Sequence, residues 1–273
     1  MFRTFIASTI ATALLAFSTL ASAAPDLDLW AFWKASNESS AQTVDHAQWQ
    51  GFIDRHVAPS ESGINLVAYG DVTPAERKTL NQYIASLTAI DPRTLRRDEQ
   101  MAYWINLYNA LTIEVVLRYP DKKSILRMGE RLFAVGPWKD KLVTIAGEEV
   151  SLDDIEHRIL RPIWRDHRIH YAVNCASLGC PNLATTAFTA DNLDALMAKG
   201  ERDYVNHPRG VSFDNGKLTL SSIYDWYGSD FADDEAGLLA HLAERHETLG
   251  NALRNYDGRV AYEYDWSPNA SSR

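Results

Sequence analysis

Both cysteines of the chain, Cys175 and Cys180, lie in one short stretch, residues 168–183, which reads R-I-H-Y-A-V-N-C-A-S-L-G-C-P-N-L. The apolar run at residues 170–173 predicts a short buried strand, and the Ala, Ser, Gly and Pro that follow predict a turn. Free N–H groups where a strand gives way to a turn or a helix stabilise a thiolate. The stretch therefore predicts a nucleophile at Cys175, whereas Cys180, which precedes proline, is predicted to be structural.

A nucleophilic cysteine requires a base and a group that orients this base. His170 precedes Cys175 by an odd spacing of five, which places the two side chains on opposite faces of a regular strand. His157 comes from a separate predicted helix, as catalytic partners commonly do. Either histidine is a candidate base, and Glu156, Asn106 or Asn109 is expected to orient His157.

Further polar and aromatic residues are candidates for the surroundings of this thiol. The backbone N–H groups of Cys175 and Ala176 are expected to hold the oxyanion of an acyl-transfer reaction. Asn106 and Asn109, three residues apart on one helix face, either serve catalysis or brace neighbouring loops, because a buried unpaired amide costs about 1–3 kcal/mol. Candidate binding residues are Asn109, Asn174, Ser177, Trp104 and Trp226.

Two function classes follow from the same residues. In the first, the protein is a cysteine-dependent hydrolase or acyl transferase. In the second, it is a non-catalytic binding or assembly module of the cell envelope. Its aromatic residues then line a groove or build the core, and Cys175 and Cys180 form a structural disulfide. Two lesser alternatives are a zinc site at H-x-x-H-x4-C-x4-C, from His167 to Cys180, and thiol exchange, which lacks the usual C-x-x-C spacing.

The elements that must position these residues follow from periodicity and capping. Asp98 is predicted to cap a buried central helix over residues 99–118. Ser151 and Asp154 fit a capping box that opens a second helix, with Glu156 and His157 on its flank. Further predicted elements are helices over residues 45–57, from 74, over 191–205 and over 223–227, an extended segment at 63–72, hairpins at 133–150 and 211–220, and a strand at 259–264.

Together these elements predict a mainly helical α+β domain without internal repeats. Residues 1–23 are typical of a secretory signal peptide, with Arg3, an apolar segment and A-S-A at 21–23. We expect cleavage after Ala23, then an N-terminal segment 24–45, one domain over 46–269 and a tail 270–273. The exported chain is expected in the periplasm of a Gram-negative source, with no membrane span after cleavage.

The charge and motifs restrict the partners. Loss of Arg3 changes the formal net charge from −9 to −10, and an acidic chain without a basic stripe is a poor nucleic-acid binder. No phosphate-cradling loop, G-x-S-x-G elbow or H-E-x-x-H helix is found, so we expect no cofactor and no metal. The expected partner is a small molecule or a peptide, and a protein partner suits the binding-module alternative.

Several long motifs occur in one order from about residue 49 to 269: M-A-Y-W-I-N-L-Y-N-A-L-T-I, S-L-D-D-I-E-H-R-I-L-R, the cysteine stretch, L-S-S-I-Y-D-W-Y-G-S-D-F and the closing Y-D-W. These motifs resemble the bacterial branch of the family called domain of unknown function 547. His167 stands where the family often has proline, and Pro268 where leucine is usual. The resemblance implies no settled activity, and a histidine that precedes the cysteine suggests a permuted papain-like or transglutaminase-like arrangement.

Overall fold

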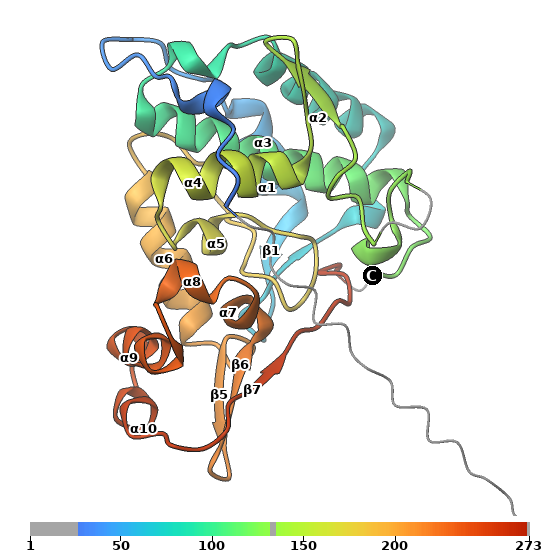
Figure 1. Cartoon of the computed structure of the whole chain (residues 1–273). Coiled ribbons are helices and arrows are strands. Elements are labelled where there is room, and N and C mark those ends of the chain that lie inside the picture. Colours follow the sequence, from blue (N-terminus) through green and yellow to red (C-terminus); the bar gives the residue numbers. More distant parts are fainter. Residues whose placement is uncertain (1–26, 132–134, 272–273) are drawn as a thin grey trace, which may run out of the picture.

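The computed structural model describes residues 27–131 and 135–271, so the predicted signal peptide lies outside the described residues. The described chain is mainly helical with small sheets, which confirms the α+β prediction (Figure 1). The α-helices are α1 (Ala47–His56), α2 (Pro74–Thr88), α3 (Arg97–Arg118), α4 (Arg161–Trp164), α5 (Ile169–Ala172), α6 (Leu193–Val205), α7 (Ser222–Trp226), α8 (Gly228–Phe231), α9 (Glu235–Arg245) and α10 (Gly250–Arg254). None of the described helices is both long and apolar enough to cross a membrane.

The strands form separate small sheets. The pairs β1 (Val57–Pro59) with β2 (Asn65–Val67) and β3 (Val143–Ile145) with β4 (Glu148–Val150) are antiparallel. A third sheet has the order β5 (Val211–Asp214), β6 (Lys217–Ser221) and β7 (Ala261–Glu263), with β7 parallel to β6. The predicted hairpin at 211–220 closes where expected, since Asn215 (φ 49°) and Gly216 (φ 77°) supply the left-handed pair that a tight turn requires. The hairpin predicted within 133–150 is formed by β3 and β4, with Ala146 (φ 49°) and Gly147 (φ 87°) at its turn.

Helix α3 is the predicted central helix, and every residue from Glu99 to Val116 is buried. The prediction that Asp98 caps it is wrong: the helix begins at Arg97, and Asp98 Oδ1 accepts a hydrogen bond from the N–H of Glu99 inside the first turn. By contrast, α2 opens with the capping box of Thr73 and Glu76, as its Thr-Pro start predicts.

Two hydrophobic cores meet at the cysteine stretch. The larger core surrounds α3, and the second is formed by α6, α7, α9 and the β5–β6–β7 sheet, which lie below α3 in Figure 1. Tyr171 packs in the second core, while the adjacent Ala172 and Val173 pack in the first. The backbone before Cys175 is therefore held from both sides.

The helix that carries Glu156 and His157 contains a π-helical segment, η5 (Asp154–Leu160). The Ser151–Asp154 capping box is confirmed, with Ser151 N–H donating to Asp154 Oδ2 (2.9 Å) and Asp154 N–H to Ser151 Oγ (3.2 Å). Pro162 has no N–H to offer the carbonyl of Arg158, and Trp30 N–H supplies that bond instead (2.9 Å). Segments of π-helix of this kind occur frequently at functional sites.

The prediction of a strand at residues 170–173 is wrong. The backbone there makes the single turn α5, because His170, Tyr171 and Val173 donate to carbonyls three or four residues earlier. His170 and Cys175 are therefore not separated onto opposite faces of a strand. Glu156 and His157, whose burial the sequence left open, are each at least nine-tenths buried.

Candidate functional site

Cys175 is a free, partly exposed thiol that two hydroxyl groups contact. Its Sγ lies 3.0 Å from Ser177 Oγ and 3.0 Å from Tyr264 OH. Burial raises the pKa of Cys175, but hydrogen bonds from Cys180, Ser177 and Tyr264 outweigh burial and lower this pKa below its ordinary value. The site therefore favours the thiolate, which is the nucleophilic form.

The loop after Cys175 is fixed by the C-terminal tail. Leu178 N–H donates to Ser267 O (2.8 Å), and Gly179 N–H donates to Asp265 O (2.8 Å). These bonds bring Tyr264 beside the thiol although the two residues are 89 positions apart.

The predicted oxyanion site is wrong because both of its N–H groups are occupied. Cys175 N–H donates to Cys180 Sγ (2.9 Å), and Ala176 N–H donates to Asn174 Oδ1 (2.9 Å). The turn at Ala176, which has a φ of 60°, directs its N–H back to Asn174. Cys180 is buried and unpaired, so the Cys175–Cys180 disulfide of the alternative hypothesis is absent.

The three candidate asparagines brace the backbone. Asn109 on α3 donates to Ala172 O (3.0 Å) and accepts from Asn174 N–H (2.8 Å), so it clamps the segment that leads into Cys175. Asn174 in turn donates to Pro181 O (2.7 Å). Asn106 makes the equivalent pair with the N–H and C=O of Phe188 (3.0 and 2.7 Å), so both amide groups of α3 are engaged as braces.

His170 belongs to a buried ionic network. Its Nε2 lies 2.7 Å from Asp230 Oδ2, its Nδ1 lies 3.7 Å from Glu156 Oε1, and its ring stacks on Tyr227 at 4.3 Å. Burial lowers the pKa of His170, but the hydrogen bonds with Asp230 and Glu156 outweigh burial and raise it above its ordinary value. Arg161 also pairs with Asp230, with 2.6 Å between Nε and Oδ2.

His157 also lies close to Glu156. Its Nδ1 lies 3.1 Å from Arg161 Nη1 and 4.0 Å from Glu156 Oε1, and its Nε2 lies 3.9 Å from Asp153 Oδ1. Burial lowers the pKa of His157 to about 4, so the ring is neutral near pH 7. Among the described residues, neither this ring nor that of His170 hydrogen-bonds to Cys175, so the direct contact of a Cys–His pair is absent.

Electrostatic effects connect the cysteine to the carboxylates. Burial and then the charges of Glu156 and Cys175 raise the pKa of Tyr108 well above its ordinary value, and Tyr227 is affected in the same way. Burial and the charge of Glu156 raise the pKa of Asp153 to about 6. Glu156 itself is ionised: burial raises its pKa, but the neighbouring His157 and His170 outweigh burial and lower it. One electrostatically linked site therefore contains Cys175, Glu156, Asp153, Tyr108 and Tyr227.

An aromatic patch formed by Trp226, Tyr264 and Trp266 lies beside the thiol. Its ring centroids are 4.6–5.5 Å apart, and all three side chains are partly exposed. Trp226 was predicted to bind ligand and lies in this patch. Trp104 was predicted likewise, but it is 1% exposed and packs edge-on against Trp33 at 5.1 Å, so it belongs to the core.

Sequence reasoning missed several residues of the site. Tyr264, Asp230, Arg161, Asp153 and Tyr108 were not proposed, although each lies within one of the quoted motifs. The predicted zinc pattern from His167 to Cys180 is also wrong. His170 is paired with Asp230, and His167 contacts Glu201. Cys175 Sγ contacts Ser177 and Tyr264, and Cys180 Sγ accepts a hydrogen bond from Cys175 N–H.

A surface cavity of about 440 Å³ lies elsewhere, lined by Leu29, Lys34, Arg97 and residues 162–165. It shares no residue with the contacts of Cys175 and is not part of this site.

In the comparison with protein families, residues 92–205 match the model described as "Protein of unknown function, DUF547". The matched residues include Glu156, His170 and Cys175, while Asp230 and Tyr264 lie beyond them. No curated protein and no solved structure matches the chain. The permuted papain-like or transglutaminase-like arrangement therefore stays a prediction.

Proposed function

We propose that this chain is a cysteine-dependent hydrolase or acyl transferase with Cys175 as its nucleophile. It belongs to the family of unknown function DUF547 through residues 92–205. One observation carries the proposal: a free, partly exposed thiol is held by two hydroxyl groups in a site that lowers its pKa. Reactive cysteines are found in such surroundings, whereas structural cysteines are buried and inert.

The reaction begins with attack of the Cys175 thiolate on an acyl carbon. A C–S bond forms, the carbonyl electron pair moves to oxygen, and collapse of the tetrahedral species breaks the bond to the leaving group, which takes up a proton. Water or an acceptor nucleophile then cleaves the thioester and restores the thiol. We assign the oxyanion to the Tyr108 hydroxyl, which stays protonated and makes no hydrogen bond with the described residues.

Proton transfer is assigned to Asp153 rather than to a histidine. His170 has partners at both ring nitrogens, and the Nδ1 lone pair of His157 accepts from Arg161. Asp153 is partly exposed, and its pKa of about 6 suits a group that gains and loses a proton near neutral pH. The Glu156 charge helps to keep that pKa high, and His157 Nε2 lies 3.9 Å from Asp153 Oδ1, so Glu156 and His157 act as positioning residues for Asp153.

The test uses the mature protein, purified without reductant. Its intact mass is followed during alkylation by iodoacetamide from pH 5 to 10, with Cys180→Ser as the matched control because serine Oγ still accepts from Cys175 N–H. We expect one fast-reacting thiol with a pKa below about 8.5, lost in Cys175→Ser and retained in Cys180→Ser. An ordinary thiol pKa, or fast labelling of Cys175→Ser, would refute the nucleophile.

Activity is then assayed with 4-nitrophenyl esters and activated amides. We expect a thioester intermediate, seen as a mass increase equal to the acyl group, in the wild type and not in Cys175→Ser. Tyr108→Phe is expected to lower kcat about 100-fold, the usual cost of one oxyanion donor. Asp153→Asn is expected to remove the limb of the pH profile near pH 6.

A binding module is the second candidate, and the partly exposed aromatic patch favours it. Such a protein would bind a small molecule or a peptide through Trp226, Tyr264 and Trp266 without reacting. Full ligand binding by Cys175→Ser, with no acyl-enzyme in the wild type, would support this function over catalysis.

We also propose that the protein acts after export, with the signal peptide removed after Ala23. The support is the sequence pattern of residues 1–23. Mass spectrometry of the protein from the periplasmic fraction should give an N-terminus at Ala24, and a chain that keeps Met1 would contradict export by this route.

A further inference from the structure

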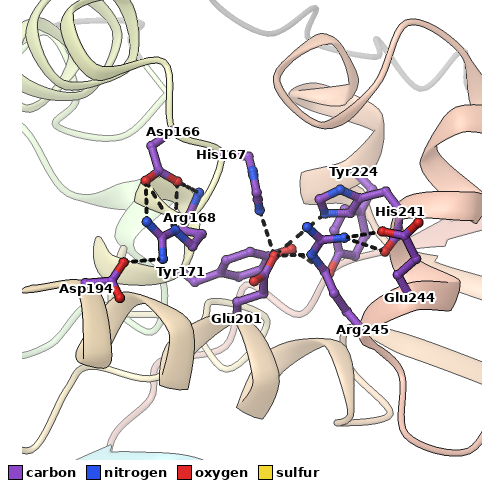
Figure 2. Close-up of polar contacts among 10 residues, drawn as sticks. All are labelled: Asp166, His167, Arg168, Tyr171, Asp194, Glu201, Tyr224, His241, Glu244 and Arg245. Carbon is purple, nitrogen blue, oxygen red and sulfur yellow. Dashed lines mark hydrogen bonds and ion pairs between the residues drawn. The ribbon is translucent and has the colours of Figure 1, made fainter.

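A second group of side chains lies apart from the thiol, on the side of α5 where α6 and α9 meet. His167 precedes α5, Glu201 lies on α6 and His241 lies on α9, so three separate segments contribute to it. Figure 2 shows Glu201 between His167 and Arg245, with His241 beside them. One ligand atom from each of His167, Glu201 and His241 lies within 4.8 Å of the others.

We propose that His167, Glu201 and His241 bind one Zn²⁺ ion, which fastens α9 to α6 and to the segment before α5. Two histidines and one carboxylate are a common ligand set for zinc when a fourth position remains for water. In tetrahedral zinc sites the ligand atoms are about 3.4 Å apart. Here His167 Nε2 lies 2.7 Å, and His241 Nε2 3.7 Å, from Glu201 Oε1, so only small shifts are needed.

The state of His241 supports a ligand role. Its Nε2 is buried and has no hydrogen-bond partner among the described residues, although a buried polar atom without a partner is costly. A zinc ion would give this nitrogen the partner that the protein itself does not supply.

Glu201 is able to bind the ion while it keeps its contact with Arg245. Its Oε1 lies 2.7 Å from His167 Nε2 and 2.7 Å from Arg245 Nε, and no described residue donates to Oε2. When His167 Nε2 binds the ion, the bond to zinc replaces its hydrogen bond to Oε1, whereas Arg245 keeps its own. Arg245 then orients the carboxylate as an outer partner of the metal, a common arrangement around metal ligands.

Access and packing also suit a bound ion. The side chains of His167, Glu201 and His241 are 23%, 13% and 11% exposed, so the group lies near the surface and His167 is its open side. The rings of His167 and His241 meet edge to face at 4.6 Å, and Phe231 packs against both rings. The ligands are therefore held in place before an ion arrives.

The experiment is a zinc titration of the full mature protein, prepared without a polyhistidine tag and stripped with a chelator. Calorimetry gives the affinity and stoichiometry for ZnCl₂, and thermal unfolding gives the stabilisation by zinc. His241→Phe keeps the aromatic packing and removes the ligand nitrogen. Glu244→Gln, an exposed neighbour on α9, is the matched control.

We expect one Zn²⁺ per chain and a higher Tm with zinc in the wild type and in Glu244→Gln. His241→Phe should weaken binding at least 100-fold, because loss of an outer partner alone costs 10- to 100-fold. Its Tm without zinc should match that of the wild type, since Nε2 makes no hydrogen bond. If this variant fails to fold, His167→Gln, which still donates to Glu201, replaces it.

Two results would overturn the proposal. One is the absence of stoichiometric binding, or equal affinity in the wild type and in the ligand variants. The other is loss of binding in the double variant Cys175→Ser, Cys180→Ser, which would assign the zinc to the thiols. None of these measurements depends on the activity proposed for Cys175.

Discussion

Asn109 and Asn106 form a matched pair for a test of what holds the Cys175 thiol in place. Both amides lie on α3, are almost fully buried and make two hydrogen bonds to backbone groups. They differ in the segment that they hold. Asn109 clamps the residues that precede Cys175, whereas Asn106 clamps Phe188, so alanine at each position should cost the same stability with different effects on the thiol.

The magnitude follows from the groups left without partners. Asn109→Ala leaves the carbonyl of Ala172 and the N–H of Asn174 without a hydrogen-bond partner, and each buried unsatisfied group costs about 1–3 kcal/mol. The expected loss is therefore about 2–6 kcal/mol, against the roughly 5–15 kcal/mol that native proteins possess. Asn106→Ala leaves the N–H and the C=O of Phe188 without partners, and its loss of stability should fall in the same range.

The assay combines urea unfolding with the rate of Cys175 alkylation. Both variants should show a lower urea midpoint, but only Asn109→Ala should change the alkylation rate and the thiol pKa, because only this variant frees the segment at residues 172–174. Two results would refute this role of Asn109. In one, Asn109→Ala is destabilised but its thiol is alkylated at the wild-type rate; in the other, Asn106→Ala changes the alkylation rate equally.

Three further outcomes are expected. Tyr264→Phe and Ser177→Ala should each raise the pKa of Cys175, because each removes a hydrogen bond that favours the thiolate, and the pH dependence of alkylation should move upward; an unchanged curve for both would contradict the assigned contacts. Gly179→Ala should lower the alkylation rate of Cys175, since the new Cβ would lie 2.8 Å from Asp265 N and displace the tail that carries Tyr264. A crystal structure or an alkylation rate identical to that of the wild type would count against this tail contact. Burial raises the pKa of Asp154, but hydrogen bonds from Lys141, Ser151 and Arg158 outweigh burial and lower this pKa to about 2. The ionised carboxylate therefore stabilises the fold above pH 4, and this stabilisation is lost as the pH falls toward 2. Asp154→Asn should lower the urea midpoint at pH 7 and make the midpoint decline less steeply in acid.

Local signals in the sequence were sufficient for several elements. The Thr73 and Ser151 capping boxes, the turn at Asn215-Gly216 and the apolar composition of α3 involve residues a few positions apart, so short-range geometry determines them. The same local reasoning failed at residues 170–173. There an apolar run is compatible with a strand or with one buried helical turn, and packing between two cores selects the turn.

The sequence alone is enough to place Cys175, Glu156, His157 and His170 in conspicuous polar motifs. The surroundings of each residue depend on the tertiary fold. Tyr264 reaches Cys175 from 89 positions away and Asp230 reaches His170 from 60, and contacts over such separations leave no periodic trace in the sequence. For the same reason the thiol is paired with hydroxyl groups rather than with a histidine, and His167 lies with Glu201 and His241 rather than with the cysteines.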